Sequence, residues 1–342
     1  MQTKTIIRGL VATGMLAAGM SCNPNPATPG HISAEAKLTP LPKQAPPPPP
    51  VQNVPLDPQL IVAADHELSE AASATDPIQR VHAMEAFRDA GVHRHKGEIL
   101  AGLSDKEPVV RFAAALAAGE MKLTAARTLL LALADDHSEN VRIAVRFALH
   151  RLGDTHLSHD LENLARDPSP VVRGNVAFVL GLLGEPSAIV ILRVLRVDLD
   201  PAVRQQASEA MWRLGDEDGL KDLLGLTYSR YPDDQMVGYL GLALPRNTAI
   251  RQHVRVGLMS EYMEITLIAA RAMGMLASDE GYVMAEAGAR SNDASQRVQA
   301  AMAFGAIGRS DTQDILRKLL ADSDPNVRVA AATAILQLKP AR

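Results

Sequence analysis

The sequence predicts an all-α protein, an α-α superhelix of about nine 31-residue helix pairs with no strands. An arginine recurs every 31 residues, prolines and glycines recur at fixed distances from it, and apolar residues follow it at helical spacing. Steps of 31 residues from Arg80 reach nine positions, and seven of them are arginine. The nine positions are Arg80, Arg111, Arg142, Arg173, Arg204, Gln235, Thr266, Arg297 and Arg328. A fixed period of this length is typical of a solenoid.

The start and end of one helix are marked in most repeats. A proline three residues before the arginine position fits the first helical turn, where its missing amide has no partner to lose. Aspartate or serine one residue earlier suits an N-cap, and a glycine eleven residues after the arginine suits a left-handed C-cap. The prolines are Pro77, Pro108, Pro170, Pro201, Pro232 and Pro325, and the glycines are Gly91, Gly153, Gly184, Gly215 and Gly308. An inner helix is therefore predicted at the same phase of every repeat.

An outer helix is predicted before each inner one, and residues 58–73 form the first. The helix pairs are predicted at 58–90, 94–118, 124–152, 156–183, 187–214, 218–244, 248–276, 280–307 and 311–338. Hydrophobic residues make up 47% of the chain and aromatic residues only 3%, which favours a core of alanine, leucine and valine. With helices ~8–10 Å apart, nine repeats would make a curved rod on the order of 80–90 Å long.

An aspartate lies six residues before the arginine in five repeats. Its carboxylate could accept charge-assisted bonds from the guanidinium of its own or an adjacent repeat. We interpret the resulting ladder as structural, and expect loss of the Arg173 side chain to strand Asp167. The predicted members are Asp105, Arg111, Asp136, Arg142, Asp167, Arg173, Asp198, Arg204, Asp322 and Arg328.

The ladder is interrupted in the sixth and seventh repeats. Gln235 and Thr266 replace the arginine, and Ser229 and Ser260 replace the aspartate. Either these repeats have drifted while still packing normally, or they form a flexible or specialised segment where the superhelix changes pitch.

Together, the aspartate in the turn, the Val-Arg pair that follows it and the spaced alanines and leucines resemble the HEAT repeat. The short unit is similar to the HEAT-like repeats of phycobilisome-lyase proteins, and the resemblance covers residues 58–338. It implies the fold, but scaffolds, adaptors and a few enzymes share such repeats, so it implies little about activity.

The N-terminal residues 1–22 are expected to be a signal peptide. Lys4 and Arg8 precede an apolar run from Leu10 to Met20 that is too short to span a bilayer. Cys22, the only cysteine of the chain, follows this run and resembles the lipid-accepting residue of a bacterial lipobox. Ordinary secretion with Cys22 as an incidental thiol is the alternative; either predicts export to the periplasm or cell envelope.

Residues 23–57 are proline-rich and are expected to form a disordered tether, with the solenoid spanning residues 58–342. At ~3 Å per residue the tether could reach on the order of 100 Å.

No phosphate-binding loop, nucleophile elbow or paired-cysteine motif occurs, so no catalytic residue and no cofactor is predicted. Two histidine groups could gather on a metal, but histidines near helix ends more often bind terminal carbonyls, so no metal site is predicted. These groups are His93 and His95, and His150, His156, His159 and Asp160. HEAT-based iron hydroxylases would need His-Glu dyads on inner helices, whereas His66-Glu67 falls on the first outer helix.

The charge of the chain opposes nucleic-acid binding. It contains 35 basic and 39 acidic residues, a net charge of −4, and removing Lys4 and Arg8 leaves 33 against 39, or −6. A protein that follows phosphates needs the opposite sign.

Several large apolar residues fall on the predicted concave side of the inner helices, where solvated positions should be polar. We interpret them as a groove for a protein or peptide, although contacts between inner helices could instead bury them. Burial of Phe147 and Phe178 would rule the groove out for these repeats. The candidates are Phe112, Leu116, Ile143, Phe147, Phe178 and Trp212.

The sequence thus favours a non-enzymatic scaffold or adaptor of the cell envelope, with a protein or peptide partner and membrane contact through a lipid anchor only. The alternative is an exported enzyme or lyase-like subunit that uses the groove for a small hydrophobic or metal-bound ligand.

Replacing the cysteine tests the anchor. A Cys22→Ser protein is expected in the soluble envelope fraction, because one lipid chain on a long tether is the predicted membrane contact. Fractionation and the mass of the N-terminal peptide measure this. Unchanged fractionation together with an unlipidated wild-type peptide would contradict the prediction.

Overall fold

The computed structural model describes residues 46–52, 54–91, 93–156 and 160–339. Within these ranges the chain forms eighteen α-helices, short 3₁₀ helices and no strands, which confirms the predicted all-α class. The signal segment, Cys22, residues 23–45 of the predicted tether and His159 lie outside the described residues.

Inner and outer helices alternate along the chain. The inner helices are α3 (Pro77–Ala90), α5 (Pro108–Glu120), α7 (Glu139–Arg151), α9 (Pro170–Leu183), α11 (Pro201–Arg213), α13 (Pro232–Ala243), α15 (Met263–Met275), α17 (Ala294–Ile307) and α19 (Pro325–Gln337). The outer helices are α2 (Pro58–Ala72), α4 (Lys96–Gly102), α6 (Arg127–Ala132), α8 (Asp160–Leu164), α10 (Ile189–Leu195), α12 (Glu217–Thr227), α14 (Arg251–Val256), α16 (Tyr282–Gly288) and α18 (Gln313–Leu320). Most outer helices after α2 are shorter than the inner ones.

The predicted caps set the ends of the inner helices. The Asp76 and Asp200 carboxylates accept hydrogen bonds from the amides two residues on, and a proline follows each of them. Gly91 and Gly308 end α3 and α17 with φ of 64° and 72°, a left-handed conformation that costs glycine nothing. Local sequence therefore determines where each inner helix begins and ends.

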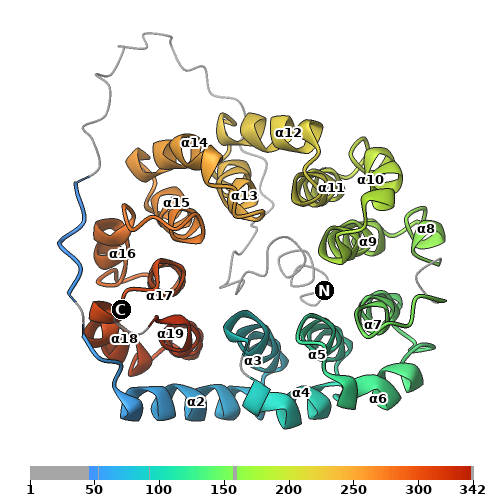
Figure 1. The fold of residues 1–342 in the computed structure, drawn as a ribbon, viewed down its shortest axis with the longest axis horizontal. Helices are drawn as coiled ribbons and strands as arrows, with labels where there is room; N and C mark the ends of the chain where they lie inside the picture. The colour runs from blue at the N-terminus through green and yellow to red at the C-terminus, as the bar shows by residue number, and fades with distance from the viewer. Residues whose placement is uncertain (1–45, 53, 92, 157–159, 340–342) are drawn as a thin grey trace, which may run out of the picture.

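The helices close into a ring (Figure 1). The inner helices surround the centre and the outer helices form the rim, and α19 packs against both α2 and α3. Helix α2 lies between α19 and α3 as α12 lies between α11 and α13, so the repeat continues across the join. The prediction of a curved rod is wrong, because a turn of about 40° per helix pair brings nine pairs back to their start.

An ion pair and hydrogen bonds join the first and last repeats. Arg328 Nε lies 2.9 Å from Glu67 Oε1, and His82 Nδ1 lies 3.1 Å from Asn326 Oδ1. Gln337 Nε2 donates to the Asp89 carbonyl at 3.3 Å. With Leu60, Ala64 and Leu68 of α2 buried as well, both polar and apolar contacts close the ring.

The segment before α2 lies against the last repeat. Arg309 donates to the Pro49 and Pro50 carbonyls at 2.9 and 3.2 Å, and the Gln52 amide donates to Asp311 at 2.9 Å. Asp57 adds a 2.9 Å ion pair with Arg317. The described part of residues 46–57 is therefore bound to the ring, and the disordered tether predicted to extend to residue 57 is wrong for this part.

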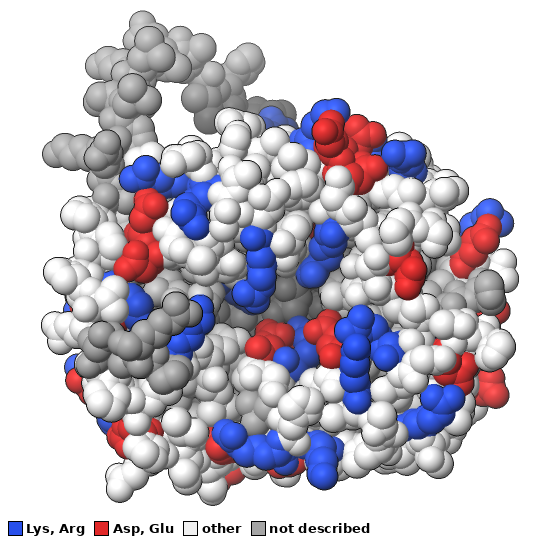
Figure 2. Space-filling model, in the orientation of Figure 1, with Lys and Arg blue, Asp and Glu red and all other residues white. Residues whose placement is uncertain are grey.

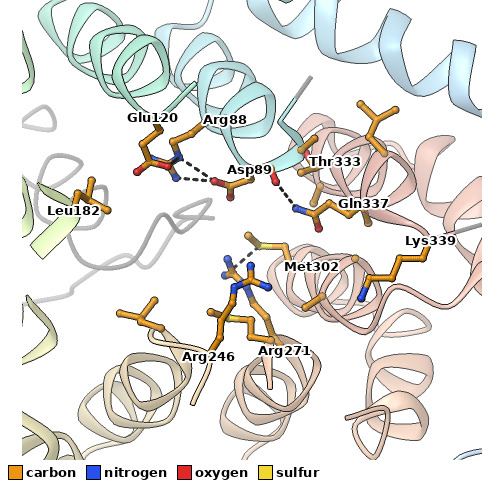
Figure 3. A pocket seen from close by; sticks show the side chains of 18 of the residues that line it. Arg88, Asp89, Glu120, Leu182, Arg246, Arg271, Met302, Thr333, Gln337 and Lys339 are labelled. Atoms are coloured by element: carbon orange, nitrogen blue, oxygen red, sulfur yellow. Dashed lines mark hydrogen bonds and ion pairs between the residues drawn. The ribbon is translucent and has the colours of Figure 1, made fainter. Parts of the chain in front are cut away.

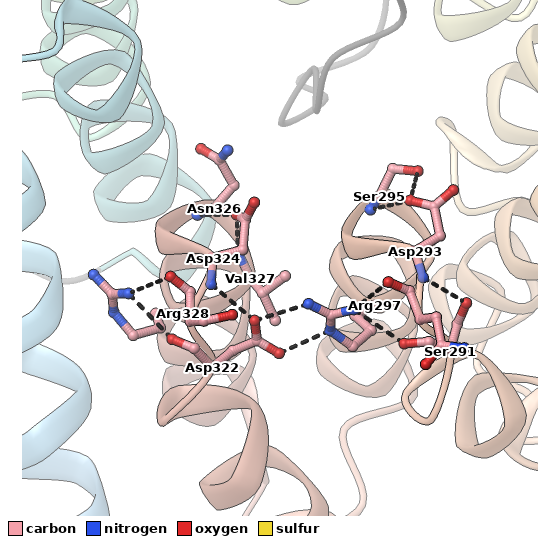
Figure 4. Close-up of polar contacts among 11 residues, drawn as sticks. Ser291, Asp293, Ser295, Arg297, Asp322, Asp324, Asn326, Val327 and Arg328 are labelled. Carbon is pink, nitrogen blue, oxygen red and sulfur yellow. Dashed lines mark hydrogen bonds and ion pairs between the residues drawn. The ribbon is translucent and has the colours of Figure 1, made fainter.

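The arginine ladder joins neighbouring repeats, as Figure 4 shows for Arg297 and Asp322. In each intact step the guanidinium donates through Nε and Nη2 to both carboxylate oxygens of an aspartate 25 residues later. The Nε–Oδ2 distances are 2.7 Å for Arg80–Asp105, 2.8 Å for Arg111–Asp136, 2.7 Å for Arg173–Asp198 and 2.7 Å for Arg297–Asp322. Arg328 reaches Glu67 instead and continues the ladder across the closure.

Each arginine also holds its own turn. Arg173 Nη1 donates to the Asp167 carbonyl at 2.7 Å, while the Asp167 carboxylate accepts from the Ser169 amide at 2.7 Å. The expectation that removing Arg173 strands the Asp167 side chain is therefore wrong. The carboxylate that pairs with Arg173 belongs to Asp198 of the next repeat. Within its own repeat, Arg173 donates through Nη1 to main-chain carbonyl oxygen only.

The interrupted repeats keep the bond within the turn and lose the bond between repeats. Gln235 Nε2 donates to the Ser229 carbonyl at 2.7 Å, and Thr266 Oγ1 contacts the Ser260 carbonyl at 3.3 Å. Arg204 likewise binds only carbonyls of its own turn among the described residues. These repeats still pack in the ring, so the interruption preserves the fold.

One more step of the ladder is altered. Arg142 Nη1 donates to the Asp136 carbonyl at 2.7 Å, but its ion pair is with Glu139 at 3.5 Å rather than with Asp167. Helices α7 and α9 also contact one another less extensively than α5 and α7.

Removing one intact ladder arginine should destabilise the ring. We expect Arg173→Ala to lower the free energy of unfolding by ~1–3 kcal/mol, because it leaves the largely buried Asp198 carboxylate without its partner. Arg204→Ala is the matched control, since it removes carbonyl bonds only, and it should cost less. Equal losses in denaturant titrations would contradict the ladder's role.

The ladder should also make the free energy of unfolding depend on pH. The Arg173 guanidinium holds the pKa of Asp198 below its ordinary 3.8. The unfolded chain then binds more protons than the folded chain near pH 3–4, so stability falls as pH falls through the lowered pKa. Asp198→Asn should be less stable at pH 7 and lose less stability between pH 5 and pH 2. A parallel pH profile for mutant and wild type would refute this.

Candidate functional site

The inner helices border a cavity at their C-terminal ends, and the opening of this cavity, which we call the channel mouth, is the candidate functional site. The C-terminal ends of the inner helices meet at this mouth, where Figure 2 shows a hollow bordered by lysine, arginine and acidic side chains. Helix C-termini carry partial negative charge, which favours cationic side chains nearby.

A cavity of about 600 Å³ occupies the mouth. Its charged lining residues are Arg88, Asp89, Glu120, Arg213, Arg246, Arg271 and Lys339. Its larger apolar lining residues are Phe178, Leu182, Leu244, Met275, Met302 and Leu336. The lining thus combines an excess of positive charge with an apolar wall.

The two acidic residues of the mouth share one arginine. Arg88 Nη2 lies 2.9 Å from Asp89 Oδ1, and Arg88 Nε lies 3.9 Å from Glu120 Oε2. Burial opposes the Arg88 charge, but Asp89 and Glu120 outweigh it and raise the pKa of the guanidinium. One guanidinium and two carboxylates leave this group with a net charge of −1.

Arg271 lies on the opposite side of the mouth without an acidic partner. Its side chain faces the cavity beside Arg246 (Figure 3), and the residue is only 9% exposed. Its Nη1 contacts Met302 Sδ at 3.7 Å, and it makes no ion pair with any described residue. Burial lowers the pKa of Arg271 and of Arg213, and the attraction of Asp89 and Glu85 for Arg271 and of Glu209 and Glu120 for Arg213 offsets this only in part.

Arg246 lies where five other repeats have the C-capping glycine. Its φ of 56° is left-handed, a conformation that costs a non-glycine residue roughly 1 kcal/mol or more. Lys122 and Ala277 adopt the same conformation in their own repeats, with φ of 51° and 58°. Arg246 therefore extends from a helix end into the mouth at some cost in backbone energy.

Two glutamates are buried on the inner helices. Glu85 Oε2 and Glu209 Oε1 have no hydrogen-bond partner among the described residues, although Gln206 Nε2 lies 3.4 Å from the other oxygen of Glu209. Burial raises the pKa of each glutamate to about 8. Both are then mainly protonated near neutral pH.

The predicted apolar groove is buried. Phe112, Leu116, Ile143, Phe147, Phe178 and Trp212 are between 0% and 7% exposed. The prediction of an exposed apolar row is therefore wrong, because small residues let adjacent inner helices approach. A Cβ on Gly119 of α5 would lie 2.8 Å from the Phe147 ring, and Trp212 Nε1 donates to the Leu242 carbonyl at 3.0 Å. Of the six, Phe178 lines the mouth cavity.

The described histidines range from buried to exposed, and His150 is half-buried. His95 is buried, stacks on Phe87 at 4.3 Å, and lies 3.1 Å from both Asp65 and Glu98. His156 is exposed. No group of three potential metal-binding side chains occurs among the described residues. None of the described helices is both long enough and apolar enough to cross a membrane.

An exposed aromatic rim on the opposite face was not predicted. Tyr231 and Tyr262 occupy N-cap positions of the interrupted repeats and are 54% and 47% exposed. Tyr228 and Leu199 lie in neighbouring turns and are 79% and 97% exposed. Tyrosine in place of the usual capping residue was the available signal.

The family model for HEAT repeats matches residues 66–150, 159–242 and 284–342. The chain belongs to the HEAT-repeat family. This confirms the resemblance drawn from the sequence. No curated protein matches this HEAT-repeat chain.

Several solved structures resemble this HEAT-repeat protein. The complex of CpcE and CpcF of phycocyanin lyase from Nostoc sp. PCC7120 is 18% identical, with a TM-score of 0.43 over 75% of this chain and 98% of that one. Human deoxyhypusine hydroxylase in complex with glycerol is 20% identical, with a TM-score of 0.38 over 71% and 96%. A Kap121p mutant is 12% identical, with a TM-score of 0.35 over 82% and 37%. Similarities at this level say nothing about activity or partner.

Proposed function

We propose that this HEAT-repeat ring is a non-catalytic scaffold or adaptor of the cell envelope that binds a segment of a protein or peptide at the channel mouth. The observation that carries the proposal is the mouth itself, where unpaired arginines and apolar side chains line one cavity. This places the partner at one end of the concave surface instead of along the buried apolar row.

The dimensions and chemistry of the mouth support binding of a peptide segment. Its volume of about 600 Å³ falls in the ~300–1,000 Å³ range of ligand pockets. Arginine is enriched among the residues that dominate protein interfaces, and solenoids commonly bind partners on their concave surfaces.

The composition of the lining favours binding over covalent catalysis. The described residues around the cavity include no serine, cysteine or histidine. An enzymatic alternative rests on Glu85 and Glu209, whose raised pKa would let a carboxyl group exchange a proton near neutral pH. An exported enzyme or lyase-like subunit would use these glutamates on a small hydrophobic ligand, with no binding segment of a partner required.

We place the scaffold at a membrane through a lipid on Cys22. Lys4, Arg8 and the apolar run before the cysteine support this location. Because the strap at residues 46–57 is bound to the ring, the spacer is reduced to residues 23–45.

Site-specific crosslinking in cells tests the proposal. A photo-crosslinking amino acid at Lys339 should capture one partner protein, because this exposed position borders the cavity. The same group at Arg290, exposed after the outer helix α16, is the matched control and should not capture it. Glu85→Gln should leave the adduct intact if the ring is a scaffold.

Two results would contradict the proposal. The first is equal capture of many proteins from both positions, and the second is no adduct at Lys339. Turnover of a small ligand that disappears with Glu85→Gln would favour the enzymatic alternative instead.

A further inference from the structure

We infer that the channel mouth is a carboxylate-binding site, and that its ligand is an acidic peptide segment with apolar residues beside its acidic ones. Arg271 and Arg246 hold the carboxylates in this arrangement. The inference rests on the proposed function in taking a peptide as the ligand, and it adds the chemistry that selects that peptide.

Arg271 is the strongest reason. It is 9% exposed, its side chain faces the cavity, and its nearest polar contact is the Met302 sulfur at 3.7 Å. A buried charge without a counter-charge is unfavourable, and supplying one recovers part of that cost. A ligand carboxylate is the natural counter-charge, because guanidinium and carboxylate pair through two parallel hydrogen bonds.

The charge balance of the mouth points the same way. Five cationic side chains and two acidic ones line the cavity, and Arg88 already pairs with both acids. Arg213, Arg246, Arg271 and Lys339 are left without an ion pair among the described residues, in a chain whose net charge is −4. The positive field is therefore local to the mouth.

The remaining lining selects among anions. Leu182, Leu244 and Met275 form an apolar wall that a phosphate or sulfate ion would leave unused. Asp89 and Glu120 would repel a densely charged polymer such as a nucleic acid. A peptide that alternates acidic and apolar residues satisfies both the arginines and the wall.

The helix dipoles work against any anion here. The C-terminal ends of the inner helices face this mouth and carry partial negative charge. The cations must overcome that field, so a bare anion gains little while a ligand that also buries apolar surface gains more. This opposition predicts discrimination between an acidic apolar peptide and inorganic phosphate.

Calorimetry on the full-length, detergent-solubilised protein tests the inference. The probe is a blocked peptide of three Leu-Glu repeats, and the comparison peptide has glutamine at every glutamate. We expect the acidic peptide to bind at least about tenfold more tightly, because hydrogen bonds between charged groups outweigh neutral ones. Inorganic phosphate at the same concentration should compete weakly.

Variants assign the effect to named residues. Arg271→Gln should weaken binding of the acidic peptide about tenfold, and Arg271→Lys should recover part of it, because the charge returns without the planar fork. Arg246→Gly should weaken binding while preserving thermal stability, since glycine suits the left-handed backbone that Arg246 adopts. Arg290→Gln is the surface control and should change neither property.

The outcomes separate this inference from the proposed function. Equal binding of both peptides, or unchanged affinity in the Arg246→Gly variant, overturns the carboxylate site but leaves a peptide-binding mouth. Complete competition by phosphate overturns the peptide as ligand. If neither peptide binds while the crosslinking group at Lys339 still captures a partner in cells, the carboxylate inference fails and the scaffold stands. If no crosslinked adduct forms either, the carboxylate inference and the proposed function both fail.

Discussion

The two-pronged bond between an arginine of one repeat and an aspartate of the next fixes the relative placement of the helix pairs at the four junctions where it is intact. Arg173 binds Asp198 through Nε and Nη2, and it binds the carbonyl of its own turn through Nη1. Asp198 also accepts the Asp200 amide, so one carboxylate holds a turn and a neighbouring helix together. Because one guanidinium binds both its own turn and the next repeat, each intact step of the ladder gives two adjacent helix pairs the same relative placement.

Closure follows from repeating that placement. A solenoid normally exposes the apolar faces of its end repeats and needs capping units. Here α2 covers α19, and Glu67 takes the place of the ladder aspartate for Arg328. The strap at residues 46–57 adds bonds to Arg309 and Arg317 beside the join. The closed ring has two faces that differ in chemistry, with charged and apolar side chains around the cavity on one face and exposed tyrosines on the other.

The parts that sequence reasoning predicted are those that local residues determine. Proline, capping aspartate and glycine set the phase of each helix, and the inner helices begin and end where those residues lie. Closure was missed because it depends on a small angle added over nine pairs, which no single repeat reveals. The direction of the ladder was left open because an aspartate six residues before one arginine also lies 25 residues after another.

The site was harder to predict than the fold. Phe147 lies under the channel surface because Gly119 lets two inner helices approach, a contact between residues of different repeats. The mouth was missed because Arg88, Arg246 and Arg271 occupy different positions of the repeat and meet only in the closed ring. A search of the sequence for residues at one fixed position of every repeat cannot find such a group.

A distance across the join tests the closed ring most directly. Spin labels on cysteines replacing Lys318 of α18 and Glu70 of α2, in a Cys22→Ser background, would span the closure. Labels replacing Ala287 and Lys318 occupy equivalent positions one repeat apart inside the array. The ring predicts that pulsed electron paramagnetic resonance gives similar short distances for the two pairs. A long distance for the first pair, on the order of the 80–90 Å of an open rod, would contradict closure.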